Sequence, residues 1–287
     1  MTRRKHYDIP IAGGRVLDLG TRPLVMGILN VTPDSFADSL HSPDPAAAAD
    51  IALRMEADGA DLIDVGGEST RPGADPVPAD EELARILPVV DRLARQLRVP
   101  ISVDTYKATV ARAALDAGAA IVNDVSGLRF DPALAAVAAE RGSALVLMHT
   151  RGRSKTMYAE ASYEDVVADV VRELADSVAA ACAAGVPRER IVVDPGLGFA
   201  KRPSHSYGVL ARLPELADAL DRPLLVGPSR KSFLRDAVSG RPASERDWGT
   251  AAAVTAAVLG GAHIVRVHAV AEMAQVVRVA EEIRRHG

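Results

Sequence analysis

Amide, carboxylate and basic side chains follow short apolar runs along this 287-residue chain, at the points where buried strands would end. They are Asn30, Asp104, Asn123, Asp194, Lys231, Arg266 and His268. A carboxylate suits the N–H edge of a polar heterocycle, whereas cations suit an anion. Any one of these groups could simply cap a helix or bind water. If the fold brings all of them to one mouth, we expect a site that binds a polar heterocycle and an anion together.

The segment 224–234 has the composition of an anion site. An apolar run meets a Gly-Pro break, and the sequence Ser-Arg-Lys-Ser at 229–232 then opens a predicted helix. Unpaired N–H groups at a helix start attract anions, and two adjacent cations strengthen that attraction. A solvated basic turn capped by Ser229 is the alternative interpretation.

The histidines and the cysteine do not have the spacing of a zinc or iron site. His149 and His268 are far apart with no His-x-His pair, and Cys182 is the single cysteine, so an internal disulfide is excluded. No Gly-x-Ser-x-Gly motif indicates a nucleophilic serine. A hard cation such as Mg²⁺ needs only one amide or carboxylate oxygen when a substrate brings phosphates, and Asn30 could provide it.

Eight apolar runs alternate with helical patterns and would position these polar residues. The runs are 24–29, 62–65, 101–103, 120–122, 144–148, 191–193, 224–226 and 264–267. Eight strand–helix repeats predict a closed (β/α)8 TIM barrel, an α/β fold whose functional residues lie at the C-terminal ends of the strands. An open doubly wound sheet is the alternative, but no Gly-x-Gly-x-x-Gly follows any run.

The helices have recognisable start and stop signals. The first has Asp44 as N-cap and Pro45 at its first position. Others are predicted over 83–97, 107–117, 132–141, 163–184, 205–219, 247–259 and 270–285. Five glycines are expected to close helices in the left-handed conformation: Gly59, Gly118, Gly142, Gly185 and Gly260. Residues 1–23, with a Gly-Gly pair, predict a short N-terminal hairpin ahead of a single barrel domain over 24–287.

Composition excludes several classes of protein. Hydrophobic residues make up 48% and charged residues 25%, which favours a packed core over disorder. Aromatics at 3% and a net charge of -4 argue against a nucleic-acid partner. No run approaches the ~18 apolar residues of a membrane span, and no apolar stretch follows the basic N-terminus. We therefore expect no membrane association and a soluble, cytoplasmic protein.

Eight motifs, in order from about residue 15 onward, resemble those of dihydropteroate synthase, the sulfonamide-target enzyme of folate biosynthesis. They are Asn30-Val-Thr-Pro-Asp-Ser-Phe36, Gly66-Gly-Glu-Ser-Thr-Arg-Pro-Gly-Ala74, Val103-Asp-Thr105, Asn123-Asp124, Leu147-Met-His149, Asp194-Pro-Gly196, Ser229-Arg-Lys-Ser-Phe233 and Arg266-Val-His268. The resemblance implies a pterin-binding (β/α)8 barrel that acts as a homodimer. It also implies a reaction in which 4-aminobenzoate displaces diphosphate from (7,8-dihydropterin-6-yl)methyl diphosphate, giving 7,8-dihydropteroate.

The same resemblance implies a role for each matching residue. The pterin-binding set is Asp104, Asn123, Val125, Met148, Asp194, Phe199 and Lys231. The diphosphate-binding set is Asn30, Arg71, Arg266 and His268, with Mg²⁺ on Asn30. The aminobenzoate-binding set is Phe36, Thr70, Pro72 and Ser232. The catalytic set is Asp104, Lys231, Arg71 and Asp38, the last on the first loop.

The chemistry agrees with these roles. Loss of diphosphate would leave positive charge on a methylene, so an SN1-like path would be assisted by Mg²⁺ and the cations, with a carboxylate such as Asp104 stabilising the cation. Because the diphosphate has partners across the mouth, the helix start at Ser232 is free for the carboxylate of 4-aminobenzoate. An arylamine is weakly basic, so no strong general base is required.

The sequence also departs from the family pattern. The departures are Ser39-Leu40-His41 in the first loop, Thr150-Arg-Gly-Arg153, Leu197, Pro228, and Ala269 after the final histidine. Two alternatives stay open on these residues. One is a catalytically impaired pterin-binding paralogue, motivated by the changed first loop and Ala269. The other is a corrinoid-linked methyltetrahydrofolate methyltransferase, which has no need for the cations of 229–232 or for a Thr70-Arg71 loop.

Overall fold

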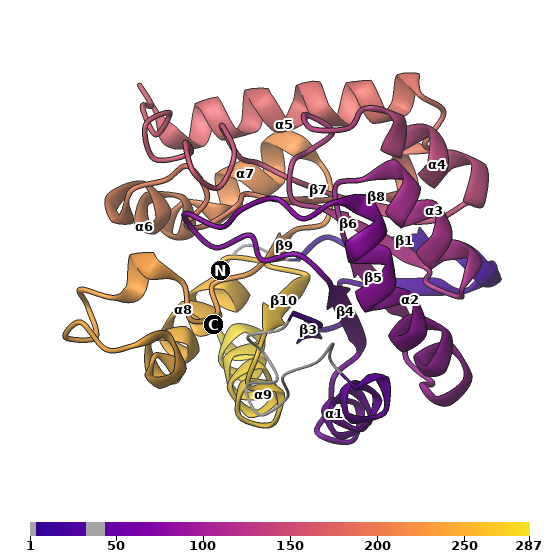
Figure 1. The fold of residues 1–287 in the computed structure, drawn as a ribbon. Coiled ribbons are helices and arrows are strands. Elements are labelled where there is room, and N and C mark those ends of the chain that lie inside the picture. The colour runs from indigo at the N-terminus through magenta and orange to yellow at the C-terminus, as the bar shows by residue number, and fades with distance from the viewer. Residues whose placement is uncertain (1–3, 33–43) are drawn as a thin grey trace.

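Parallel strands form a ring at the centre of the computed structural model, which describes residues 4–32 and 44–287 (Figure 1). The strands are β3 (Leu24–Asn30), β4 (Leu62–Gly66), β5 (Ile101–Asp104), β6 (Ile121–Asp124), β7 (Ala144–Met148), β8 (Ile191–Asp194), β9 (Leu225–Val226) and β10 (Ile264–Val267). Their spatial order is β8-β7-β6-β5-β4-β3-β10-β9. A parallel bridge between Val193 and Leu224 joins the two ends of this sheet. The eight predicted strands and the barrel are confirmed.

Helices follow the strands and cover the outside of the ring (Figure 1). They are α1 (Pro45–Ala57), α2 (Ala79–Gln96), α3 (Ala108–Asp116), α4 (Ala133–Arg141), α5 (Val166–Ala183), α6 (Pro203–Ala211), α7 (Leu213–Leu220), α8 (Asp247–Leu259) and α9 (Val270–His286). The Asp44 side chain accepts from the Ala46 N–H at 2.9 Å, as its N-cap position predicts. Among the described residues, no helix has the length and hydropathy needed to cross a membrane.

Three details of the predicted helices are wrong. The single helix over 205–219 is two helices, α6 and α7, because Pro214 lacks the N–H that would continue the first. The helix expected from 229–232 is one 3-10 turn, Ser232–Leu234, because Arg230 has a φ of 58° and Lys231 is extended. Gly260 has a φ of -76°, and its neighbour Gly261 takes the left-handed conformation instead.

The N-terminal hairpin packs beneath the barrel. Strands β1 (Tyr7–Pro10) and β2 (Val16–Leu19) pair in antiparallel register, as predicted. The buried side chains of Ile9 and Leu19 join one apolar cluster with Met26, Leu62 and other residues near the N-terminal ends of the barrel strands. The larger core lies between the strands and the surrounding helices. The barrel floor is thus filled, which leaves the C-terminal ends of the strands for a site.

Candidate functional site

A cavity of about 550 Å³ lies at the C-terminal ends of the strands. Ten of the residues predicted from the sequence line it: Asn30, Thr70, Arg71, Pro72, Asp104, Phe199, Lys231, Ser232, Arg266 and His268. The fold therefore brings together side chains that are more than 200 residues apart in the chain. Phe36 and Asp38 lie outside the described residues.

The guanidinium of Arg266 is held by two carboxylates at the base of this cavity. Its Nε donates to Asp64 Oδ2 at 2.6 Å, and its Nη2 donates to Asp104 Oδ2 at 2.6 Å. Asn123 Nδ2 donates to the same Asp64 oxygen at 2.9 Å. Burial raises the pKa of Asp104 to about 7, against the opposing effect of Arg266. This network fixes the orientation of Arg266 and leaves the amide oxygen of Asn123 available to a ligand.

Asp64 is a site residue that the sequence reasoning missed. Its side chain is fully buried, and its Oδ1 has no hydrogen-bond partner within the described part of the chain. An unpartnered buried carboxylate oxygen is costly, and Asp64 acts on the site through its other oxygen, which holds Arg266 and Asn123. The available signal was a carboxylate inside the apolar run 62–65, where a purely structural strand would have carried an aliphatic side chain.

Asp194 and Met148 are buried at neighbouring strand ends rather than on the cavity lining. They are paired in the parallel register of β7 and β8. The Gly196 N–H donates to Asp194 Oδ1 at 2.7 Å. Burial raises the pKa of Asp194, and the nearby cation of Lys231 opposes that rise. Asp194 thus provides a third buried carboxylate, besides Asp64 and Asp104, close to the cations of the mouth.

Lys231 presents its ammonium to the cavity beside an aromatic wall. Its Nζ lies 4.6 Å from the ring centre of Phe199. Burial lowers the pKa of Lys231 to about 8, and Arg266 acts in the same direction, whereas Asp194 and Asp104 raise it. The lysine is therefore a cation whose charge depends on the pH near neutrality.

His268 is oriented by Ser229. The serine Oγ accepts from the His268 backbone N–H at 3.1 Å and lies 2.9 Å from the ring Nδ1. Burial, followed by Arg266 and Arg230, lowers the pKa of His268 to about 3, so the ring is neutral. The Ser229 hydroxyl can donate to Nδ1, and in that arrangement the neutral ring carries its proton on Nε2, where it can donate to a ligand. Ser229 thus orients this histidine.

A buried chain of polar groups supports the outer wall of the site. Lys201 Nζ donates to His149 Nδ1 at 2.7 Å and to the Phe199 carbonyl at 3.2 Å. The other ring nitrogen, Nε2, lies 3.1 Å from Glu173 Oε2, so His149 carries its proton there. The chain links α5 to the loop after β8 and holds the backbone of Phe199. Sequence reasoning did not identify Lys201, because the local sequence does not distinguish this buried lysine from an exposed one.

The donors available for a metal ion are hard oxygen ligands. No group of three or more His, Cys, Asp and Glu side chains suited to a metal lies within residues 4–32 and 44–287. Asn30 ends β3 and lines the cavity. One amide oxygen fits Mg²⁺ carried in by a phosphate-bearing substrate, and does not fit zinc or iron.

The fold and the site define a pterin-binding barrel enzyme: residues 26–268 match the family described as "Pterin binding enzyme". A dihydropteroate synthase from Synechocystis sp. is 45% identical over 281 residues, which cover 98% of this chain and 97% of that protein. The chain belongs to the dihydropteroate synthase family, whose members are transferases of folate biosynthesis. This membership confirms the synthase prediction over the corrinoid-linked alternative.

Solved structures of synthases superimpose over nearly the whole chain. The Xanthomonas albilineans enzyme with 4-aminobenzoic acid has a TM-score of 0.88 at 42% identity, covering 96% of this chain and 98% of that one. The Burkholderia cenocepacia enzyme complexed with 7,8-dihydropteroate has a TM-score of 0.87 at 44% identity, covering 98% and 97%. The structural agreement therefore includes enzymes holding a substrate and a product of the reaction.

Proposed function

We propose that this chain binds the pterin of (7,8-dihydropterin-6-yl)methyl diphosphate with Asp104, Asn123, Asp194 and Lys231. The observation that carries this proposal is the Arg266 network, which sets buried carboxylates and an amide beside two cations at one mouth. The N–H edge of the pterin would face Asp194, and its carbonyl would accept from Lys231. Val125, Met148 and Phe199 would enclose the flat ring.

The diphosphate would leave on the side of the mouth opposite the pterin. Arg71, Arg266 and the Nε2 proton of His268 would bind its oxygens. Asn30 would hold Mg²⁺ through its amide oxygen, and the bound ion would neutralise charge on the departing group. The carbon–oxygen bond would break with its electron pair going to the diphosphate, and the Asp104 carboxylate would stabilise the resulting cation.

The second substrate would approach from the outer part of the cavity. Thr70, Pro72 and Ser232 would shape its place, together with Phe36, and Asp38 on the first loop would complete the catalytic set. The amine nitrogen of 4-aminobenzoate would form the new bond to the methylene and lose one proton to solvent. Orientation of the two substrates would supply much of the rate.

The test is an assay of diphosphate release with each substrate alone, with both together, and with or without Mg²⁺. We expect release only when both substrates and Mg²⁺ are present. Arg71→Met should lower kcat/KM by about tenfold to a hundredfold, the loss of about one charge-assisted contact. Tight pterin binding with no release at any enzyme concentration would instead favour a catalytically impaired paralogue.

We also propose a homodimer whose interface includes the outer faces of α8 and α9. Trp248 at the start of α8 is 89% exposed, and Val279 and Ile283 on α9 are 62% and 49% exposed. The two helices pack against each other (Figure 1). Large apolar side chains on adjacent helices favour burial against a second copy. Sedimentation velocity should give the mass of a dimer, and a monomer mass would contradict the proposal.

A further inference from the structure

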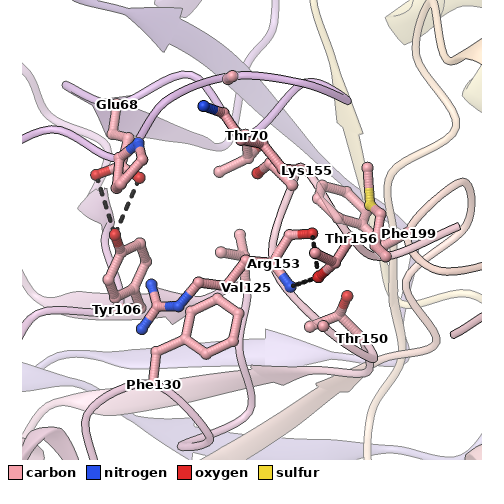
Figure 2. A pocket seen from close by; sticks show the side chains of 15 residues that line it. Glu68, Thr70, Tyr106, Val125, Phe130, Thr150, Arg153, Lys155, Thr156 and Phe199 are labelled. Carbon is pink, nitrogen blue, oxygen red and sulfur yellow. Dashed lines mark hydrogen bonds between the residues drawn. The ribbon is translucent and has the colours of Figure 1, made fainter. Parts of the chain in front are cut away.

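Glu68 lies between β4 and the residues Thr70 and Arg71, and the roles proposed above leave it without a function. Its side chain lines the catalytic cavity and a smaller cavity of about 220 Å³ that adjoins it (Figure 2). Only 10% of the side chain is exposed. A charged group buried to this extent costs free energy, so its contacts should show what it is retained for.

The carboxylate of Glu68 joins three places in the chain. Its Oε2 accepts from the Val77 N–H at 3.2 Å, which ties the two ends of the loop 68–77 together. Its oxygens also accept from the Tyr106 hydroxyl at 3.0 and 3.3 Å (Figure 2), and it pairs with the ammonium of Lys107. Because these two residues closely follow β5, Glu68 fastens the loop after β4 to the loop after β5.

Stability alone does not require a charge at position 68. Lys107 also pairs with Glu82 on α2, whose side chain is buried, so two carboxylates share one ammonium. Burial raises the pKa of Glu82, and Lys107 opposes that rise. Without Glu68 the other two groups would form a balanced pair, whereas the second carboxylate adds like-charge repulsion at a buried position. The benefit of Glu68 therefore lies in the loop that it holds.

The loop 68–77 is the support of Arg71. This side chain lines the catalytic cavity, is exposed, and has no ion-pair partner in the part of the chain that the structure describes. Its place at the mouth is therefore set by the backbone of the loop. The Gly73 N–H donates to the Ser154 carbonyl at 3.0 Å, so the tip of the loop rests against the segment that follows β7. The base of the loop is fixed by Glu68.

We propose that Glu68 is a positioning residue that sets the place of Arg71 by closing the base of the loop 68–77. The inference rests on the proposed function, in which Arg71 binds the diphosphate, and adds a residue that acts on the leaving group without touching it. Removal of the carboxylate frees the Val77 N–H and the two side chains after β5. The affinity for the diphosphate then falls, whereas the affinity for the pterin ring does not, because its proposed partners lie on other strands.

Two probes separate the diphosphate from the pterin. One is (7,8-dihydropterin-6-yl)methyl diphosphate, and the other is 6-hydroxymethyl-7,8-dihydropterin, which has the same ring and no phosphate. Their affinities for the full chain are measured by calorimetric titration with Mg²⁺. Glu68→Ala should weaken the first probe about tenfold and leave the second within about twofold. Glu68→Gln, which keeps an accepting oxygen for Val77, should recover most of the loss.

A double variant tests whether Glu68 acts through Arg71. Arg71→Met alone should weaken the diphosphate probe, and adding Glu68→Ala should then change the affinity by less than about twofold. Tyr106→Phe removes one donor to Glu68 and keeps its charge, so it should weaken the same probe about twofold to threefold. The matched control Glu140→Gln removes an exposed carboxylate that pairs with Arg112, and it should leave both affinities unchanged.

Hydrogen exchange provides a measurement that does not depend on a ligand. In the Glu68→Ala protein the backbone amides of 69–77 should exchange at least about tenfold faster, while those of the barrel strands keep their rates. An unchanged rate over 69–77 would show that Glu68 does not hold the loop and would overturn the proposal.

Two binding results would also overturn it. Equal weakening of both probes by Glu68→Ala would indicate a general loss of packing, and a full additional loss in the double variant would show that Glu68 acts on another group. The Arg71→Met protein distinguishes this inference from the proposed function. If that variant binds the diphosphate probe normally, the diphosphate assignment fails and this inference fails with it. If Arg71→Met weakens the probe and Glu68→Ala does not, the assignment stands and the role of Glu68 alone is refuted.

Discussion

Replacement of Asp64 by asparagine would test the network that orients Arg266. The carboxylate is fully buried, and one oxygen accepts from both Arg266 and Asn123. Asp64→Asn keeps the shape but removes the charge. The amide oxygen can still accept from both donors, but it no longer offers Arg266 a negative charge, and the N–H₂ group takes the buried place of the unpartnered Oδ1.

The expected loss in the free energy of unfolding is limited, because Arg266 keeps its second carboxylate partner, Asp104. Removing one partner of a buried ion pair costs about 3–5 kcal/mol when the remaining charge is uncompensated. Arg266 retains Asp104 at 2.6 Å, so only one charge-assisted hydrogen bond is lost, about 1.5–3 kcal/mol. We expect the free energy of unfolding to fall by about 2 kcal/mol. For a chain of this size that corresponds to a Tm about 4–8 °C lower.

Calorimetry and kinetics together check this reasoning. Differential scanning calorimetry gives the Tm, and diphosphate release should show kcat/KM for the pterin substrate reduced about tenfold or more, since a displaced Arg266 no longer faces the site. Asp91→Asn is the matched control, because Asp91 pairs with Arg95 on the exposed face of α2. Solvent screens such an exposed pair, so its loss should leave the Tm almost unchanged. An Asp64→Asn protein with unchanged Tm and kcat/KM would show that Asp64 does not hold Arg266.

Two further predictions concern Lys231 and Gly196. The pKa of Lys231 is lowered to about 8, so its ammonium is lost as the pH rises through that value, and kcat/KM should fall on the alkaline side. Lys231→Arg, which stays charged, should remove that fall, whereas a wild-type profile that is flat well above this pH would contradict it. Gly196→Ala would place a Cβ 2.0 Å from the His149 carbonyl at a φ of 68°, and urea unfolding should show a loss of at least about 2 kcal/mol. Gly240→Ala, at a φ of 74° with open space around it, should lose only about 1 kcal/mol, and equal losses would disprove the clash.

The barrel could be predicted from the sequence because each strand is a short apolar run and most helices close at a glycine. Periodicity alone could not show that α6 and α7 are separate, since the apolar spacing continues across the break and only Pro214 interrupts it. Nor could it show that the chain leaves the helical conformation at Arg230, where tertiary contacts hold a φ of 58°. The anion site expected at Ser232 therefore rests on one 3-10 turn rather than on a helix start.

The site could be predicted where polar residues end an apolar run, as Asp104 and Arg266 do. Asp64 was not predicted as a site residue because it lies inside the apolar run 62–65 rather than at its end. Of the smaller cavity of about 220 Å³ beside Arg153, only Thr70, Val125 and Phe199 were predicted as site residues from the sequence. Its walls come from four loops, and the stacking of Arg153 on Phe130 depends on how those loops fold, which no local pattern records.

The seventh strand, β9, is only two residues long, so it does little to fix the lysine that follows it. The backbone there is fastened from outside the barrel. The Arg230 N–H donates to Thr250 Oγ1 at 3.0 Å, and Arg246 donates to the Arg230 carbonyl at 3.1 Å. The lysine loop and the start of α8 therefore form one transferable module. A graft of residues 228–231 into another barrel would also need residues 246–250. Without their two hydrogen bonds to the Arg230 backbone, the orientation of Lys231 would not be fixed.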